Sequence, residues 1–136
     1  MYLIQVTVKE SPIDGKGVFT LQTIKAGDVV WRFDSTHDKT LTRAEFDALD
    51  KREKEVLRKV AYLSKNTGRW VYPPTNDPAL YTNHSKENNL SAVLNKAISE
   101  EPIFVANRDI NVGEELTNNY HEFDDLTENL EAEWLK

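Results

Sequence analysis

Hydrophobic and polar positions in the first third of the chain follow a pattern that predicts short strands. Residues 3–8 alternate between apolar and polar side chains and are rich in β-formers, which is typical of a strand. Residues 18–20 and 29–33 have the same character, and glycine-containing turn signals at residues 11–17 and 25–28 separate these segments. We therefore predict that the chain begins as a mainly β structure.

Between about residues 38 and 68 the pattern becomes helical. Thr42 and Glu45 have the spacing of a capping box, and Asp50 and Glu53 repeat it at the start of a longer helix. Acids balance the many basic residues here, so we interpret this insert as an ordinary charged helix surface rather than a nucleic-acid site. In the short helix we expect Phe46 and Leu49 to be buried, and the longer helix has apolar residues on one face at helical spacing: Val56, Leu57, Val60 and Leu63.

The second half of the chain predicts more strands and a final helix. Residues 69–72, 90–94, 103–106 and 116–118 are short extended segments. The expected fold class is thus mainly β with a helical insert, followed by an amphipathic C-terminal helix over about residues 121–136. That helix is predicted because apolar side chains recur at spacings of three, four and four residues: Phe123, Leu126, Leu130 and Trp134.

Composition narrows the class of protein. With 136 residues and 39% hydrophobic content, we expect a single domain over residues 1–136 with one core. There is no apolar run long enough to cross a membrane, and the first residues lack the features of a signal peptide. Because the chain has no cysteine, disulfides and cysteine-ligated metal sites are excluded. These features indicate a soluble, cytoplasmic or otherwise intracellular protein.

The net charge of −6 is unevenly distributed. From residue 121 onward there are six acidic residues and one basic residue, Lys136. An acidic surface repels nucleic acids and attracts cationic peptides, although a solvated helix face that serves solubility is the simpler interpretation. We expect no nucleic-acid partner.

Three motifs follow one another in a fixed order. Residues 15–19 read Gly-Lys-Gly-Val-Phe, residues 83–85 read Asn-His-Ser with Asn89 downstream, and residues 113–117 read Gly-Glu-Glu-Leu-Thr with Tyr120 downstream. Each motif alone is common. In this order, around a helical insert, they resemble the SET-domain family of S-adenosylmethionine-dependent protein-lysine methyltransferases, over about residues 11–120.

The resemblance implies a SET-type fold and a cofactor site. The fold is β-clip-like, with several short sheets, and its segment after Tyr120 passes under the Asn-His loop in a knot-like arrangement. The cofactor would be S-adenosylmethionine, with S-adenosylhomocysteine as product and no metal. The cofactor-binding positions implied by the resemblance are Gly15, Lys16, Gly17, Val18, Phe19, Tyr81, Asn83, His84, Tyr120 and Phe123.

Several of these residue types suit such a role. A glycine turn allows close approach of backbone to a ligand, so main-chain groups of residues 15–17 would meet the amino-acid end of the cofactor. Asn83 offers both a donor and an acceptor for the cofactor's amino group. His84 would meet the adenine through its backbone, while its ring fixes the loop. Ordinary structural roles for Asn83 and His84 are the alternative.

Tyr120 is the expected catalytic residue. Methyl transfer needs a neutral lysine amine, and holding a free lysine neutral at pH 7 costs roughly 4–5 kcal/mol. A narrow apolar channel lowers that cost by desolvation, and a tyrosine hydroxyl with nearby carbonyls can orient the amine. The alternative is a buried core tyrosine at a strand end.

The chain departs from the family pattern at several positions. Lys86 and Asn88 replace the usual cysteine and proline of the loop, although Asn89 is kept. Phe33 stands where a tyrosine is usual after the third strand, so one hydroxyl near the target amine is missing. Asn118 occupies the position that often affects the degree of methylation. Because no cysteine-rich zinc segment follows, Phe123 and Trp134 are the candidates to close the lysine channel and cover the adenine, with simple core packing as the alternative for Trp134. The residues expected at the substrate channel are Phe33, Asn118 and Trp134.

Two functions remain in competition. The first is a protein-lysine methyltransferase acting on a protein or peptide whose target lysine lies in a basic context, with homodimer formation left open. The second is a catalytically weak SET-like module that binds the cofactor or a peptide. A hydrolase built on Ser85 is disfavoured because no nucleophile turn is present. A metal site built on His37, His84 and His121 is disfavoured because no pair of them has ligand-like spacing.

Overall fold

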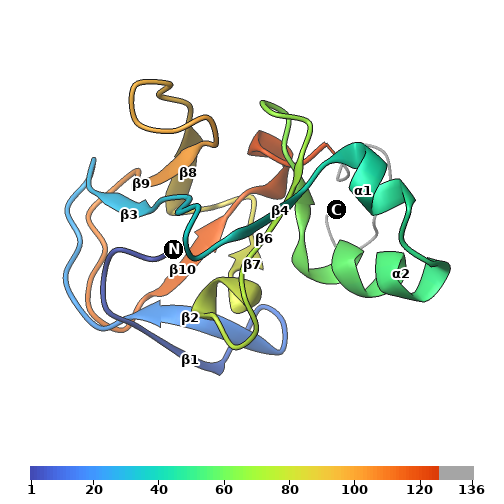
Figure 1. The fold of residues 1–136 in the computed structure, drawn as a ribbon. Coiled ribbons are helices and arrows are strands. Elements are labelled where there is room, and N and C mark those ends of the chain that lie inside the picture. Colours follow the sequence, from blue (N-terminus) through green and yellow to red (C-terminus); the bar gives the residue numbers. More distant parts are fainter. Residues whose placement is uncertain (126–136) are drawn as a thin grey trace.

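The computed structural model describes residues 1–125 and consists of short strands with two helices at one end (Figure 1). In chain order the elements are β1 (Val6–Glu10), β2 (Lys16–Thr20), β3 (Val29–Trp31), β4 (Lys39–Leu41), α1 (Arg43–Asp47), α2 (Lys51–Val60), β5 (Tyr62–Leu63), β6 (Trp70–Tyr72), the 3-10 helix η1 (Pro78–Tyr81), β7 (Asn83–His84), β8 (Leu90–Val93), β9 (Ile103–Ala106), β10 (Glu115–Asn118) and the 3-10 helix η2 (Tyr120–Glu122). The predicted fold class, mainly β with a helical insert, is confirmed.

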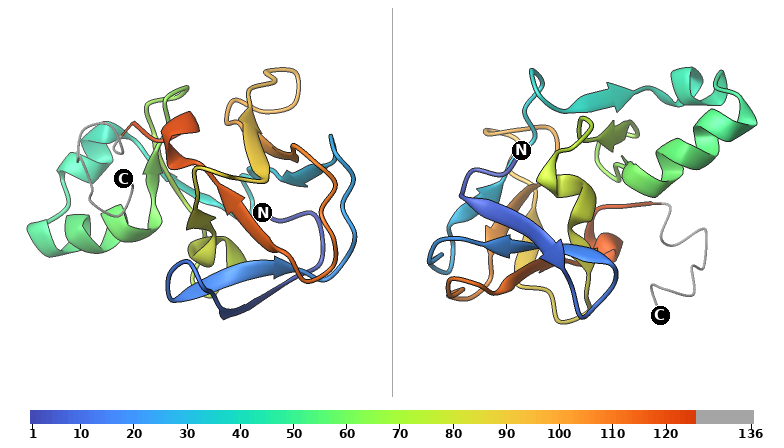
Figure 2. Two further views of the ribbon diagram at one scale, coloured as in Figure 1. Left: turned by 180° about the vertical axis from the view of Figure 1, so that it is seen from behind. Right: turned by 90° about the horizontal axis from the view of Figure 1, so that it is seen from below.

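The strands form three small sheets. Their orders are β1-β2-β10-β7, β3-β9-β8 and β4-β6-β5. In the first sheet β10 pairs antiparallel with β2 and parallel with β7, so a strand from late in the sequence lies in the sheet interior. Helices α1 and α2 lie beside the third sheet, away from β1 and β2 (Figure 2).

Two hydrophobic clusters hold these sheets together. The smaller cluster anchors the insert, where the rings of Phe46 and Trp70 stack with centroids 4.1 Å apart. The larger cluster joins the first and second sheets, and burial of its side chains removes their apolar surface from water. Its buried members are Val18, Ile24, Val30, Trp31, Leu90, Phe104, Ala106, Ile110, Leu116 and Phe123.

The helix starts predicted from sequence are confirmed. Thr42 accepts the Glu45 backbone N–H and the Glu45 side chain accepts the Thr42 backbone N–H, which together form a capping box. Asp50 and Glu53 do the same at α2. Both boxes satisfy donors that a helix terminus would otherwise leave without partners.

The longer helix is shorter than predicted, and the apolar face assigned to it is largely exposed. Val56 is 60% exposed and α2 has no fully buried residue, although Leu57 packs partly against the smaller cluster. Leu63 is buried, but it lies in β5 rather than in the helix, because residues 62–63 pair with β6. A tertiary strand pairing therefore ends the helix earlier than the apolar spacing predicts.

The first predicted strand is shifted along the chain. β1 covers Val6–Glu10, whereas residues 1–3 run beside β3, with Tyr2 bridged to Trp31. At the other end, the predicted helix over residues 121–136 lies largely outside the described residues, and Asp124 forms a β-bridge with Ser64. Within residues 1–125, no helix has the length and apolar character needed to cross a bilayer.

Candidate active site

A cleft of about 1060 Å³ brings together segments that are far apart in the sequence. Its walls come from the turn before β2, from η1 and β7, from the end of α2 with β5, and from the segment after β10. Clefts of roughly 300–1,000 Å³ bind cofactors and other small ligands in many proteins. This cleft therefore has room for a cofactor and a substrate side chain.

The glycine turn forms one wall of the cleft. Gly15 has a φ of +46°, a conformation that residues with a Cβ rarely adopt, and its carbonyl accepts the backbone N–H of Ser11 at 2.8 Å. Gly17 is needed for a different reason, because an added Cβ would overlap the Glu115 carboxylate and approach the Ser11 Cβ to 3.0 Å. The turn thus packs directly against the Glu115 side chain of β10.

Asn83 connects this turn to β7. Its Nδ2 lies 3.1 Å from the Lys16 carbonyl oxygen and 3.2 Å from the Asp14 carbonyl oxygen. The same nitrogen lies 2.9 Å from Glu115 Oε2 and 3.2 Å from Ser11 Oγ. An amide nitrogen has only two hydrogens, so these acceptors share them. Asn83 therefore holds the glycine turn in place.

The loop after β7 is locked onto β10 by Asn89. Asn89 is 2% exposed, and its Nδ2 donates to the Glu115 carbonyl at 2.8 Å. Its Oδ1 accepts the Thr117 backbone N–H at 2.9 Å, and the Ser85 backbone N–H donates to the Asn118 carbonyl at 2.9 Å. These hydrogen bonds, from Ser85 at the start of the loop and Asn89 at its end, fix the loop against the strand that leads to Tyr120.

Tyr120 is held at both ends by the segment around β7. Its hydroxyl donates to the Thr82 carbonyl at 2.7 Å, and its backbone N–H donates to His84 Nδ1 at 3.1 Å. Burial, with smaller contributions from the charges of Asp124 and Asp14, raises the pKa of Tyr120 to about 12. The residue is thus a neutral phenol at physiological pH, with its proton directed to a carbonyl.

Most of the predicted site residues border this one cleft. Asn118 is 7% exposed. Three residues that line the cleft, Trp31, Asp38 and Asn118, each have a buried polar side-chain atom with no partner within residues 1–125. Such atoms call for a polar ligand or water. The predicted residues that line the cleft are Gly15, Lys16, Tyr81, Asn83, His84, Asn118, Tyr120 and Phe123.

Other predicted residues lie elsewhere. Val18 and Phe19 belong to the buried core, and neither they nor Gly17 line the cleft. Phe33 lines a second pocket of about 560 Å³ beside Arg32 and residues 98–101. Trp134 is outside the described residues.

Sequence reasoning missed two cleft residues that contact each other. The hydroxyls of Tyr2 and Thr82 are 2.6 Å apart, and both residues line the cleft. No sequence signal pointed to Tyr2, because it precedes the predicted strand over residues 3–8 and belongs to none of the three motifs. Thr82 could have been found through its position directly before Asn83. Within the described part of the chain, no group of three metal-ligating side chains gathers at one point.

Comparison with known proteins identifies a family and related folds. A family model described as the SET domain matches residues 15–121. A candidate histone methyltransferase of Plasmodium falciparum superposes with a TM-score of 0.58 at 19% identity, covering 86% of this chain and 93% of that one. No curated protein matches the sequence significantly.

The Polycomb Repressive Complex 2 of Chaetomium thermophilum gives a similar result. One structure of it superposes with a TM-score of 0.66 at 25% identity over 93% of this chain, and a humanized mutant gives 0.62 at 25% identity over 92%. This chain spans only 17% and 16%, respectively, of the matched chains. The likeness to the Plasmodium falciparum protein, at its lower identity, concerns the fold alone.

Proposed function

Because this chain belongs to the SET-domain family, we propose that it is a protein-lysine methyltransferase that uses S-adenosylmethionine. One observation carries the proposal: Tyr120 donates its hydroxyl proton to Thr82 and its backbone N–H to His84, at a cleft that the Gly15–Lys16 turn also lines. These residues come from all three sequence motifs. Their meeting at one cleft supports the proposal.

The cofactor would lie along the wall formed by the glycine turn and β7. Since Asn83 Nδ2 is directed to the carbonyls of Asp14 and Lys16, its Oδ1 is the atom suited to accept a bond from the cofactor's ammonium group. The aromatic side chains of Tyr81 and Phe123 offer apolar surface in the same cleft. When bound, S-adenosylmethionine supplies an electrophilic methyl group on a sulfonium.

The target amine would be oriented by Tyr120 and Asn118. A phenol that donates to a carbonyl can accept a hydrogen bond from an amine N–H through its oxygen, and such a bond directs the nitrogen lone pair. Asn118 also lines the cleft, and its buried Oδ1, which has no partner among residues 1–125, would be the second acceptor. Burial of the amine favours its neutral, nucleophilic form. Positioning, rather than covalent chemistry, would supply the rate acceleration.

The proposed substrate is a protein or peptide that carries the target lysine. Six acids lie between residue 121 and the last residue of the sequence, and they would attract a lysine with basic neighbours.

Calorimetric titration with S-adenosylmethionine and S-adenosylhomocysteine tests the cofactor site directly. We expect saturable binding by the wild type and a loss of tenfold or more, about 1.4 kcal/mol, in Asn83→Ala. Asn95→Ala is the matched control, because Asn95 is exposed in the β8–β9 connection and does not line the cleft. Failure of the folded wild type to bind either ligand would contradict the proposal.

Turnover is tested separately. Incubation with isotopically labelled S-adenosylmethionine and a panel of lysine peptides, followed by mass spectrometry, should detect methylated product. Cofactor binding without product on any peptide or protein extract would favour the alternative, a SET-like binding module.

A further inference from the structure

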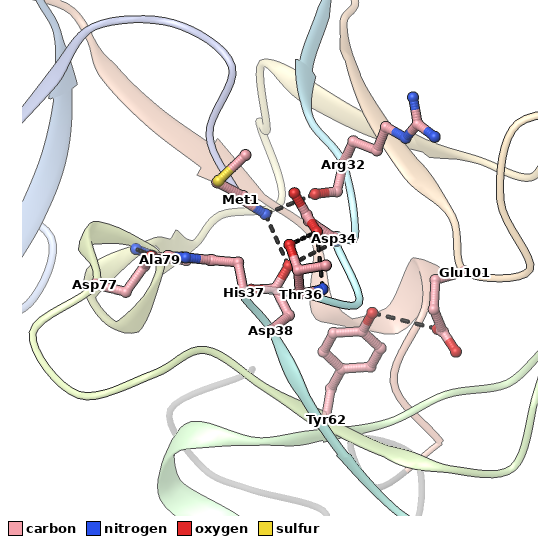
Figure 3. Close-up of polar contacts among 10 residues, drawn as sticks. All are labelled: Met1, Arg32, Asp34, Thr36, His37, Asp38, Tyr62, Asp77, Ala79 and Glu101. Carbon is pink, nitrogen blue, oxygen red and sulfur yellow. Dashed lines mark hydrogen bonds and ion pairs between the residues drawn. The ribbon is translucent and has the colours of Figure 1, made fainter.

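The first three residues form an edge segment that presents Tyr2 to the cleft. Tyr2 bridges Trp31, the Leu3 backbone N–H donates to the Val30 carbonyl at 2.8 Å, and the Arg32 backbone N–H donates to the Met1 carbonyl at 3.1 Å. The Met1 amino group also contacts the Arg32 carbonyl at 2.6 Å and Asp38 Oδ2 at 3.1 Å (Figure 3). The Tyr2 ring packs against the larger hydrophobic cluster. These contacts fix the position of the ring.

Thr82 places the Tyr2 and Tyr120 hydroxyls close together. Its Oγ1 lies 2.6 Å from the Tyr2 hydroxyl, while its main-chain oxygen accepts the Tyr120 hydroxyl at 2.7 Å. Both tyrosines line the same cleft. Two phenols that are far apart in the sequence therefore converge on the two oxygens of a single residue.

The Tyr2 hydroxyl keeps acceptor capacity in this arrangement. A phenol oxygen has one proton and two acceptor positions, and its bond to Thr82 uses one of these functions, whichever group donates. At least one lone pair is left for an amine N–H in either case. Burial raises the pKa of Tyr2, so the hydroxyl is not ionised at physiological pH.

We propose that Tyr2 is the second hydroxyl that orients the target amine, acting beside Tyr120; this inference rests on the methyltransferase function proposed above. Tyr2 would replace the hydroxyl that is absent at Phe33, where the family pattern has a tyrosine. Phe33 lines the other pocket and has no hydroxyl. In this chain the missing hydroxyl would be supplied by Tyr2, which bridges Trp31 of β3 and lies outside the three motifs.

The inference can be tested without knowing the protein substrate. Sinefungin is an analogue of S-adenosylmethionine in which a carbon bearing an amine replaces the methylated sulfonium, so its amine probes the place where methyl group and target amine meet. S-adenosylhomocysteine lacks this amine. We expect Tyr2→Phe to weaken sinefungin binding by roughly fivefold, within the range of one net hydrogen bond, and to leave S-adenosylhomocysteine affinity within about twofold, below the size of one such bond.

Two further variants make the comparison specific. Tyr62→Phe also removes a hydroxyl from a cleft tyrosine, but that hydroxyl donates to Glu101 at 3.3 Å rather than to Thr82 (Figure 3), so the preference between the two ligands should be unchanged. Thr82→Val removes Oγ1 and keeps the carbonyl that holds Tyr120, and it should reduce sinefungin affinity in the same direction as Tyr2→Phe.

The outcomes separate the two proposals. Selective loss of sinefungin affinity in Tyr2→Phe and Thr82→Val supports the role of Tyr2. An unchanged preference between the two ligands, or an equal loss of both, overturns that role while leaving the methyltransferase proposal standing. Absence of binding of both ligands to the folded wild type overturns the methyltransferase proposal itself.

Discussion

The backbone N–H of Tyr120 donates to Nδ1 of His84 over 3.1 Å, across a separation of 36 residues in the sequence. A backbone N–H can only donate, so Nδ1 must be unprotonated, and the ring's proton sits on Nε2 in the neutral form. The two rings lie 5.1 Å apart. The Asn-His motif thus fixes the backbone of the proposed catalytic tyrosine, a role that differs from contact with a ligand.

Replacement of Tyr120 by phenylalanine should separate catalysis from cofactor binding. The change removes the hydroxyl that contacts Thr82 and keeps the ring. We expect methyl transfer to fall by roughly 100-fold or more, because the amine loses its positioning group. Cofactor affinity, measured by calorimetry, should stay nearly constant. Retention of wild-type turnover by Tyr120→Phe would remove Tyr120 from the mechanism.

Loss of the His84 ring should affect both stability and turnover. In His84→Ala the partly buried Tyr120 N–H loses its acceptor, which should cost about 1 kcal/mol of unfolding free energy. Urea unfolding monitored by tyrosine and tryptophan fluorescence measures this loss. His121→Ala is the control, because His121 is exposed and its ring lies next to that of His84. Equal stability of the two variants would speak against the anchoring role of His84.

A side chain at position 17 should disturb the turn through Glu115. In Gly17→Ala the new methyl group would overlap the Glu115 carboxylate, and such overpacking typically costs about 1–3 kcal/mol. The double variant Gly17→Ala with Glu115→Ala removes the overlap. We expect the effects on unfolding free energy to be non-additive, with the double variant less destabilised than the sum of the single changes. Strict additivity would show that strain elsewhere, rather than this contact, is responsible.

Alkaline titration should reveal the buried environment of Tyr120. Its pKa is raised from 10.0 to about 12, so between these values the folded chain keeps a proton that the unfolded chain releases. The contribution of Tyr120 to stability is therefore complete below about pH 10 and is lost as pH rises through about 12. The ultraviolet absorbance of tyrosinate, followed as pH rises, measures this ionisation. The Tyr120→Phe variant should lack one tyrosine that ionises at high pH in the wild type. A missing group that ionises near pH 10 would contradict the buried placement.

The parts of the fold that local signals encode were predictable. The capping boxes at Thr42 and Asp50 depend on residues three positions apart, so sequence alone places both helix starts. The end of α2 was not predictable in this way, because Leu63 leaves the helical pattern only to pair with Trp70 in β6. Tertiary pairing overrides local preference at such positions.

Some residues of the candidate site were likewise predictable from the sequence, and others were not. The order of the motifs is enough to single out Asn83, His84 and Tyr120, and all three line one cleft. Tyr2 escapes sequence reasoning because its partner Thr82 is 80 residues away, and only the folded chain brings their hydroxyls to 2.6 Å. Phe33 was singled out from the sequence but lines the second pocket, because its position after a strand does not determine which pocket its side chain reaches.

The interior position of β10 has a consequence for the order of folding. Strand β2 is made early and β7 later in synthesis, but the strand that separates them is made after both, with Tyr120 directly behind it. Until that strand inserts, one edge of β2 stays without its partner and offers a surface for aggregation. Closure over such sequence distances is slow. The chain beyond Tyr120 must therefore leave the ribosome before the proposed site can assemble, so we expect a translation product that stops short of β10 to lack this site.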